Sequence, residues 1–248
     1  NDKNGETAIP RDLGGAHNVA CGFGFSLAIR NDGTVASWGS NNHGQASVPA
    51  GLKHVKAVSA GSNHSLALLE NGMVKAWGDG SLGQATPPAG LENVIAVSAG
   101  GAHSLALTRN GKVVVWGYDY WGRTAMPDDL ENATMISAGC RHSLALKSDG
   151  NVVAWGDNWQ GQSSVPMGIG RVKAIAAGAN HSLALLEDGT VCAWGDNNKG
   201  QVDVPPGLER VKSISAWGYF SIAVREDGSV VAWGENKMGQ IDVPGKLK

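Results

Sequence analysis

The sequence predicts an all-β protein, a β-propeller of six four-stranded antiparallel blades, from its repeat, its strand-like segments and its glycine content. A Trp-Gly dipeptide recurs at one constant interval of 39 residues, with its Trp at positions 38, 77, 116, 155, 194 and 233. Short runs of β-forming residues fill each repeat. Glycine occurs 36 times in 248 residues, roughly twice its usual share, which favours tight turns over long helices.

The constant period sets the domain organisation. It defines repeats 1–39, 40–78, 79–117, 118–156, 157–195 and 196–234, and a partial closing repeat at 235–248. We expect a single propeller domain over residues 1–248, closed at six blades. The end segments 1–10 and 235–244 resemble each other, so they would compete for or share one closing position. A seven-bladed ring stays open as an alternative if the sequence lacks one repeat.

The fifth repeat illustrates the elements expected in each blade. Residues 172–176, 182–186 and 190–194 alternate or are apolar and predict three strands, with an Asp-Gly hairpin turn before the third. Residues 201–204 predict a short fourth strand. Proline follows directly, at Pro205–Pro206 here, and a residue without an N–H group fits the end of a ladder.

Charge and composition exclude several function classes. Twenty basic and 22 acidic residues give a net charge of −2, too balanced to attract a polyanion, so we expect no nucleic-acid partner. No apolar run approaches the roughly 20 residues of a membrane helix, so we expect no membrane association. The three cysteines lack metal-ligand spacing, and no phosphate-binding or nucleophile motif stands out. We expect no cofactor, no metal and no enzymatic activity.

Two columns of the repeat carry bulky or reactive side chains. The Trp column in the third strand is most simply explained by packing between blades. A His column precedes a Ser column, at His64, His103, His142 and His181. Phenylalanine, which neither ligates metal nor transfers protons, fills the His slot at Phe25 and Phe220, and adjacent strand residues point to opposite faces. A packing or capping histidine is therefore favoured over a metal ring or a His-Ser catalytic pair.

Strand parity places two sets of loops on one face: the turn between the first two strands and the loop after Trp-Gly. Every aromatic residue outside the Trp column lies in these loops. They are Phe23, Phe25, Tyr118, Tyr120, Trp121, Trp159, Trp217, Tyr219 and Phe220. Large aromatics gathered on one surface are typical of an interaction site.

The fourth repeat departs most from the pattern and supplies the main candidate site. Its loop replaces the usual glutamine with Arg123. The candidate partner-binding residues around it are Tyr118, Asp119, Tyr120, Trp121, Arg123, Arg141, Asp157 and Trp159. A second cluster at the closing seam would contain Phe23, Trp217 and Tyr219, whereas Phe25 and Phe220 are better explained as packing at the seam.

The repeat AG-x-x-HSLAL-x-x-[ND]G-x-V-x-x-WG-x-x-x-x-G-Q-x-x-x-P resembles the regulator of chromosome condensation superfamily of β-propellers. The compact repeat is most similar to the secreted bacterial propellers that inhibit β-lactamases. This resemblance implies a secreted protein whose loop aromatics cover a partner enzyme's active site. Relatives of this kind usually have seven blades, and this chain has six complete repeats.

These observations favour a non-enzymatic, monomeric binding module that holds a protein partner on its aromatic loop face. In this hypothesis Arg123 and Arg141 donate to a partner carboxylate, and Asp119 and Asp157 pair with partner cations. One alternative is a glycan-binding propeller, since Trp and Tyr platforms with Asn and Asp also suit sugars. Another is a scaffold of the guanine-nucleotide-exchange type.

Overall fold

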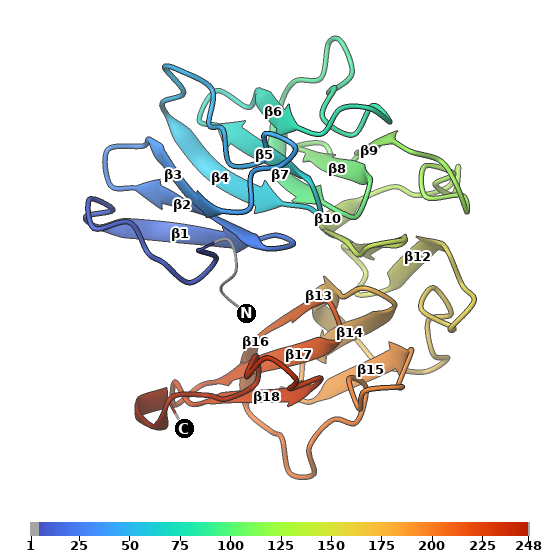
Figure 1. The fold of residues 1–248 in the computed structure, drawn as a ribbon. Helices are drawn as coiled ribbons and strands as arrows, with labels where there is room; N and C mark the ends of the chain where they lie inside the picture. Colours follow the sequence, from blue (N-terminus) through green and yellow to red (C-terminus); the bar gives the residue numbers. More distant parts are fainter. Residues whose placement is uncertain (1–4, 248) are drawn as a thin grey trace. The chain divides into compact units, whose positions relative to one another are not determined.

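The computed structural model describes residues 5–247 and contains six three-stranded antiparallel sheets, one for each repeat (Figure 1). Residues 1–4 and 248, which belong to the first and the partial closing repeat, lie outside the described part. The chain divides into two compact units, residues 1–120 and 121–248, with three sheets in each. None of the helices in the described part is long and apolar enough to cross a membrane.

The three sheets of the first unit are formed by consecutive strands. They are β1 (Ala16–Cys21), β2 (Phe25–Arg30) and β3 (Val35–Gly39); β4 (Val55–Ala60), β5 (His64–Leu69) and β6 (Val74–Gly78); and β7 (Val94–Ala99), β8 (His103–Thr108) and β9 (Val113–Gly117). The second unit repeats this order. Its strands are β10 (Ala133–Ala138), β11 (His142–Lys147) and β12 (Val152–Gly156); β13 (Val172–Ala177), β14 (His181–Leu186) and β15 (Val191–Gly195); and β16 (Val211–Trp217), β17 (Phe220–Arg225) and β18 (Val230–Gly234), followed by a 3-10 turn at Gly245–Leu247.

The predicted fourth strand is wrong, because the segment after the Trp-Gly loop is a chain of turns. In the segment after the fifth sheet, the N–H of Val202 donates to the Asn197 side chain, and that of Asp203 donates to the carbonyl of Gly200. The N–H of Val204 donates to the carbonyl of Val202. These local bonds use the donors that a ladder would need, so the sheet ends at its third strand.

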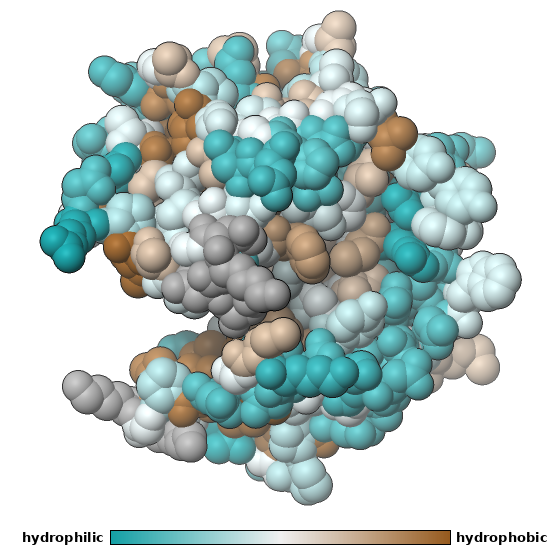
Figure 2. Space-filling model, in the orientation of Figure 1, coloured by the Kyte–Doolittle hydropathy of each residue, from teal (hydrophilic) through white to brown (hydrophobic). Residues whose placement is uncertain are grey.

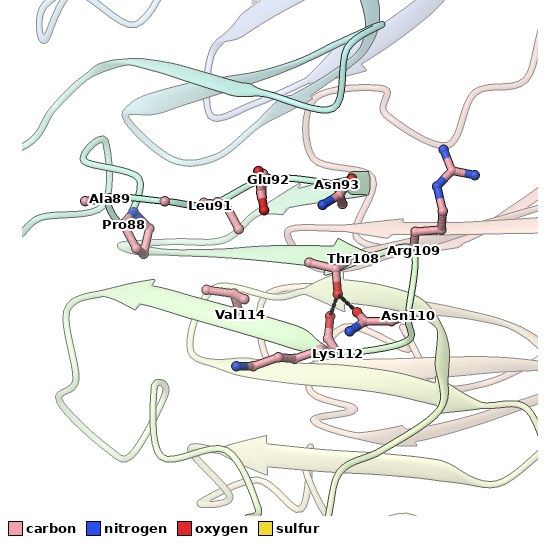
Figure 3. Close-up of a pocket in the computed structure, with 11 residues that line it drawn as sticks. Pro88, Ala89, Leu91, Glu92, Asn93, Thr108, Arg109, Asn110, Lys112 and Val114 are labelled. Carbon is pink, nitrogen blue, oxygen red and sulfur yellow. Dashed lines mark hydrogen bonds between the residues drawn. The ribbon is translucent and has the colours of Figure 1, made fainter.

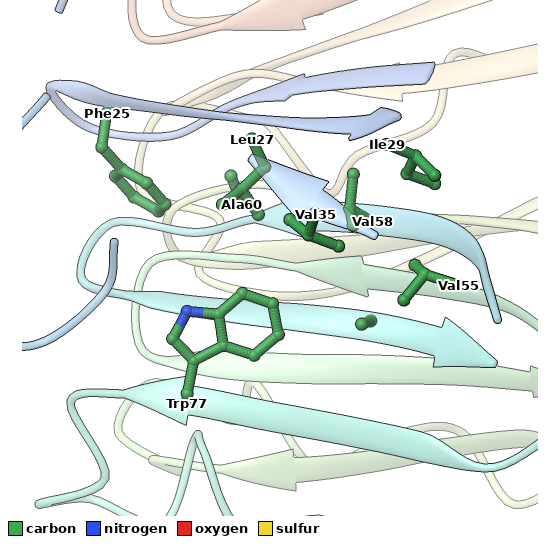
Figure 4. Packing of buried hydrophobic residues seen from close by; sticks show 9 residues of the cluster. Phe25, Leu27, Ile29, Val35, Val55, Val58, Ala60 and Trp77 are labelled. Atoms are coloured by element: carbon green, nitrogen blue, oxygen red, sulfur yellow. The ribbon is translucent and has the colours of Figure 1, made fainter. Parts of the chain in front are cut away.

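The core lies between consecutive sheets within each unit. Figure 4 shows one such layer, where Phe25 and Leu27 of β2 face the second sheet and meet Val58 and Trp77. Leu66 and Leu68 of β5 fill the next layer with Trp116. Each fully buried aliphatic side chain contributes roughly 1.5–3 kcal/mol through its apolar area. The second unit has two equivalent layers, and Trp194 and Trp233 contribute to them.

The packing role predicted for the Trp column is confirmed for five of its members, which are buried, and Trp38 is half-buried. Each indole N–H also donates to a backbone carbonyl 32 residues earlier, as Trp77 does to Gln45 at 2.9 Å. Trp38 donates in the same way to Glu6 at 3.0 Å, in the N-terminal segment. This segment therefore supplies the first sheet with the carbonyl that the loop after the preceding Trp-Gly supplies to every other sheet.

Candidate functional site

The loop after each Trp-Gly is a regular turn in five repeats. In the turn after Trp155, the side chain of Gln162 accepts a hydrogen bond from the N–H of Gln160 at 2.9 Å, and Asp157 accepts from the N–H of Trp159 at 3.0 Å. The Gln oxygen makes the same bond in the other four turns at 2.8–3.0 Å. An Asp accepts as well in the turns of Asp79, Asp157 and Asp196, so two side-chain acceptors hold these three loops closed from within.

The loop of the fourth repeat has neither acceptor at those positions, since Tyr118 replaces the Asp and Arg123 replaces the Gln. The carbonyl of Arg123 still accepts the Trp155 indole N–H at 2.9 Å, so the loop keeps its attachment to the following sheet. Trp121 has a φ of 68°, a left-handed backbone that is uncommon for a bulky residue.

Five candidate residues meet in the second unit: Trp121, Arg123, Arg141, Asp157 and Trp159. The guanidinium carbons of Arg123 and Arg141 lie 4.9 and 4.7 Å from the centroid of the Trp121 ring, within the range of cation–π contacts. Arg141 also lies 3.9 Å from the carboxylate of Asp157. Arg123 and Asp157 are buried, with 5% and 4% of their surface exposed, whereas Arg141 is exposed.

Trp121 and Trp159 both line a depression of about 490 Å³, and Gly156, Asp157 and Asn158 form the rest of its lining. Trp159 is 86% exposed. Gly156 has a φ of 98°, and a Cβ there would lie 2.7 Å from the carbonyl oxygen of Arg141, so only glycine fits this position. Asn158 was not among the predicted residues, although its place beside Asp157 in the turn was a signal for it.

The other candidates of the first four repeats belong to the first unit. Tyr118 and Tyr120 are exposed and stack with ring centroids 5.8 Å apart and an interplanar angle of 11°. Asp119 between them is exposed. Phe23 is 71% exposed in the turn before β2. Phe25 is buried in the core with residues of the second sheet, and its packing at the closing seam stays a prediction.

Trp217 and Tyr219 belong to the last sheet of the second unit. Trp217 ends β16 and pairs with Phe220 at the start of β17, and both side chains are half-buried. Tyr219 lies in the turn between them and is exposed. The predicted grouping of these residues with Phe23 joins the two units and stays a prediction.

The His column forms hydrogen bonds between repeats. Nε2 of His64 lies 2.9 Å from Oγ of Ser104, and Nε2 of His142 lies 2.8 Å from Oγ of Ser182. His181 makes the same contact with Ser221 at 3.0 Å. These side chains are fully buried, which agrees with the packing interpretation. The sequence did not indicate the partner, because it lies 40 residues away rather than next to the histidine.

The hydroxyl protons identify the tautomer of these histidines. Oγ of Ser104 donates to the carbonyl of Gln84, so Nε2 of His64 must be the donor in its bond to that hydroxyl. Burial lowers the pKa of His64 to about 4 and that of His142 to about 3. A neutral ring and a hydroxyl proton committed to a carbonyl do not form an activated nucleophile.

The cavity at the opposite ends of the strands differs from the aromatic loops in its residue types. In the first unit a cavity of about 620 Å³ there is lined by the segment from Pro88 to Asn93 and by the hairpin after β8, and none of its lining residues is aromatic (Figure 3). Thr108 and Asn110 brace the hairpin (Figure 3), where the Thr108 hydroxyl lies 2.9 Å from the Lys112 carbonyl. In Figure 2 the visible surface is mostly hydrophilic or neutral, with small hydrophobic areas.

Among residues 5–247, no three His, Cys, Asp or Glu side chains are grouped so that they could hold a metal ion. The cysteines of this part are free thiols. Burial raises the pKa of the Cys140 thiol, which favours its uncharged form over a thiolate ligand.

Several solved structures are similar to this chain. The chain is similar to human WBSCR16, with 22% identity and a TM-score of 0.81 over 97% of this chain and 81% of that one. It is similar to Prp20p of Saccharomyces cerevisiae, with 22% identity and a TM-score of 0.82 over 94% and 75%. The CRINKLY WD40 ectodomain of the Arabidopsis thaliana receptor kinase ACR4 shares 23% identity, with a TM-score of 0.73 over 92% and 88%.

No curated protein matches the chain by sequence. The model of the regulator of chromosome condensation (RCC1) repeat matches more than half of it, at residues 16–45, 55–84, 94–120, 135–162, 172–201 and 211–240. These six segments coincide with the six sheets and with the Trp-Gly loop that follows each of them. The chain therefore belongs to the family of proteins built from RCC1 repeats.

Proposed function

We propose that the protein is a non-enzymatic binding module that holds a protein partner on its aromatic loops. The observation that carries this proposal is the position of the exposed aromatics. Among residues 5–247 they all lie in the turn between the first two strands of a sheet or in the loop after a third strand. They are Phe23, Tyr118 and Tyr120 in the first unit and Trp121, Trp159 and Tyr219 in the second. Tyr and Trp dominate interface hot spots, because they bury a large area with few rotatable bonds.

The two units contribute different contacts in this proposal. In the second unit Trp159 is the principal anchor, and Arg141 is the exposed cation beside it, able to donate to a partner carboxylate. Asp157 is buried and acts through Arg141 and the Trp159 backbone rather than by touching a partner cation. In the first unit the stacked pair of Tyr118 and Tyr120 forms a flat platform.

Two comparisons support a protein as the partner. The solved structure of Prp20p is described together with its binding to Gsp1p and histones, and yeast RCC1 has been solved bound to Kap60. Inhibition of a β-lactamase is the specific form that the sequence resemblance suggests. A purified β-lactamase is therefore the first candidate partner to assay.

The decisive experiment compares two double variants in an affinity pull-down followed by titration of the retained protein. Tyr120→Ala/Trp159→Ala removes aromatic surface, and Met73→Ala/Met167→Ala removes exposed apolar surface outside those loops. We expect the aromatic variant to lose at least 30-fold in affinity, about 2 kcal/mol, and the methionine variant to bind like the wild type. Equal binding by both variants and the wild type would refute the proposal.

Glycan binding is the second candidate, favoured by the exposed Trp159 beside the amide of Asn158. A glycan array probed with wild type and Trp159→Ala separates the two functions. Specific sugar binding that disappears in the variant would replace the protein-binding proposal.

We also infer that the six sheets close into one propeller ring. The constant period and the packing of consecutive sheets within each unit support this arrangement. Small-angle X-ray scattering should then give a radius of gyration of about 18 Å, the value for a compact chain of this length. A clearly larger radius would indicate an open arrangement or association.

A further inference from the structure

We propose that Arg123 is a positioning residue that creates the partner-binding surface of the second unit by holding Trp121 in its left-handed conformation. The proposal rests on the protein-binding function above and names the residue that makes this part of the surface.

In the regular turns a glutamine oxygen accepts the N–H of the residue two positions earlier. That earlier residue is His43, Leu82, Gln160, Lys199 or Met238, and none of these has a positive φ. The acceptor thus fixes both the closed turn and the ordinary backbone of the residue it caps.

An arginine at this position cannot do the same. Its guanidinium has only donors, so Arg123 cannot accept the N–H of Trp121. The residue it would have capped, Trp121, is the one that has a φ of 68°. Since the Arg123 carbonyl keeps its hydrogen bond to Trp155, the exchange alters the loop without detaching it from the sheet.

The side chain of Arg123 then takes a new role. Only 5% of the Arg123 surface is exposed, and its guanidinium carbon lies 4.9 Å from the Trp121 ring centroid. Arg141 contacts the same ring at 4.7 Å and is held near Asp157. The two guanidinium groups fix an indole that remains partly exposed at the depression that Trp159 also lines. In a loop where Tyr118 also replaces the Asp acceptor, the arginine at position 123 thus makes one side of a binding surface from what is a closed turn in the other repeats.

The test uses Arg123→Gln, which restores the residue of the other five repeats and is expected to fold. Arg123→Lys is the matched variant, because it also lacks an acceptor but loses the planar group that stacks on the indole. The first readout needs no partner: the indole N–H resonance of Trp121, assigned with Trp121→Phe, and a crystal structure of Arg123→Gln. The second is the affinity for the protein retained in the pull-down.

We expect Arg123→Gln to shift the Trp121 resonance, to return its φ to a negative value and to weaken binding at least 10-fold, with an unchanged or higher melting temperature. Arg123→Lys should keep a positive φ and weaken binding less. An unchanged resonance and φ in Arg123→Gln would overturn the positioning role. A moved indole with unchanged affinity would uphold the positioning role and refute the use of Trp121 in binding.

Discussion

The buried His column and the loops after Trp-Gly follow the same 39-residue period, yet one is nearly uniform and the other varies. His64, His142 and His181 each bond a serine of the next repeat, and each of these serines donates to the carbonyl of a Gln. A change at any of these positions leaves a buried polar group without its partner. The loop residues between Trp-Gly and Gln bond mostly within their own turn, so a loop such as 118–123 can change without disturbing the neighbouring sheet. Binding surfaces can arise at positions whose side chains make no required contact with the next repeat.

The largest expected effect is the loss of folding stability at low pH, which the buried histidines cause. The pKa values of His64, His142 and His181 are lowered by burial to about 4, 3 and 4, against 6.5 in the unfolded chain. Their Nδ1 atoms are buried without a hydrogen-bond partner, so the folded state resists protonation. The free energy of unfolding is therefore at its full value above pH 6.5. It falls as the pH drops from 6.5 toward 4, by up to ~2 kcal/mol per histidine at pH 5.

Urea unfolding between pH 7.5 and pH 5 measures this loss. His64→Phe is the matched control, because phenylalanine already occupies the equivalent buried position at Phe25. The variant should lose less stability on acidification than the wild type. Identical pH profiles would show that the buried histidines do not set the acid sensitivity.

The next largest effect is on the free energy of unfolding, and it should differ between buried and exposed tryptophans. Trp194→Ala removes a buried indole and leaves the Gln162 carbonyl without its 3.0 Å hydrogen bond from this ring, so we expect a loss of about 3–5 kcal/mol in the free energy of unfolding. Trp159→Ala, in the neighbouring loop, should change that free energy by no more than about 0.5 kcal/mol. Comparable losses in both variants would remove the distinction between interior and loop.

The smallest effect is expected for an exposed ion pair at the ends of the strands opposite the aromatic loops. Arg171 and Glu187 form an ion pair at 3.4 Å, and both side chains are more than half exposed. Solvent and salt screen such a pair, so Arg171→Ala should lower the free energy of unfolding by less than about 0.5 kcal/mol and leave partner affinity unchanged. A loss of partner affinity in this variant would extend the binding surface beyond the aromatic loops.

Much of the fold follows from the sequence. Alternating runs such as 172–176 and the Asp-Gly turns gave the first three strands of each repeat, because these signals are local. The fourth strand failed because Val202 and Val204 look like strand residues, whereas their N–H groups bond to Asn197 and to a nearby carbonyl. Turn hydrogen bonds of this kind are not visible in a hydrophobic pattern.

For the candidate site, the sequence identified the unusual residues but not their roles. It marked Arg123 as the exception in a Gln column and Trp159 as an aromatic outside the Trp column. It could not show that Arg123 is buried against Trp121 while Arg141 remains exposed. Side-chain exposure depends on which neighbour fills the space around a loop, and that neighbour lies in another segment of the chain.

By itself the sequence determined the repeat, its strands and the positions where the repeat is broken, because each of these depends on residues close together in the chain. Only the tertiary structure decided the contacts that span 32 or 40 residues, from Trp77 to Gln45 and from His64 to Ser104. It also decided that Trp121 is fixed between two guanidinium groups. These contacts depend on the distance and direction between side chains, which only the packing of one sheet on the next sets.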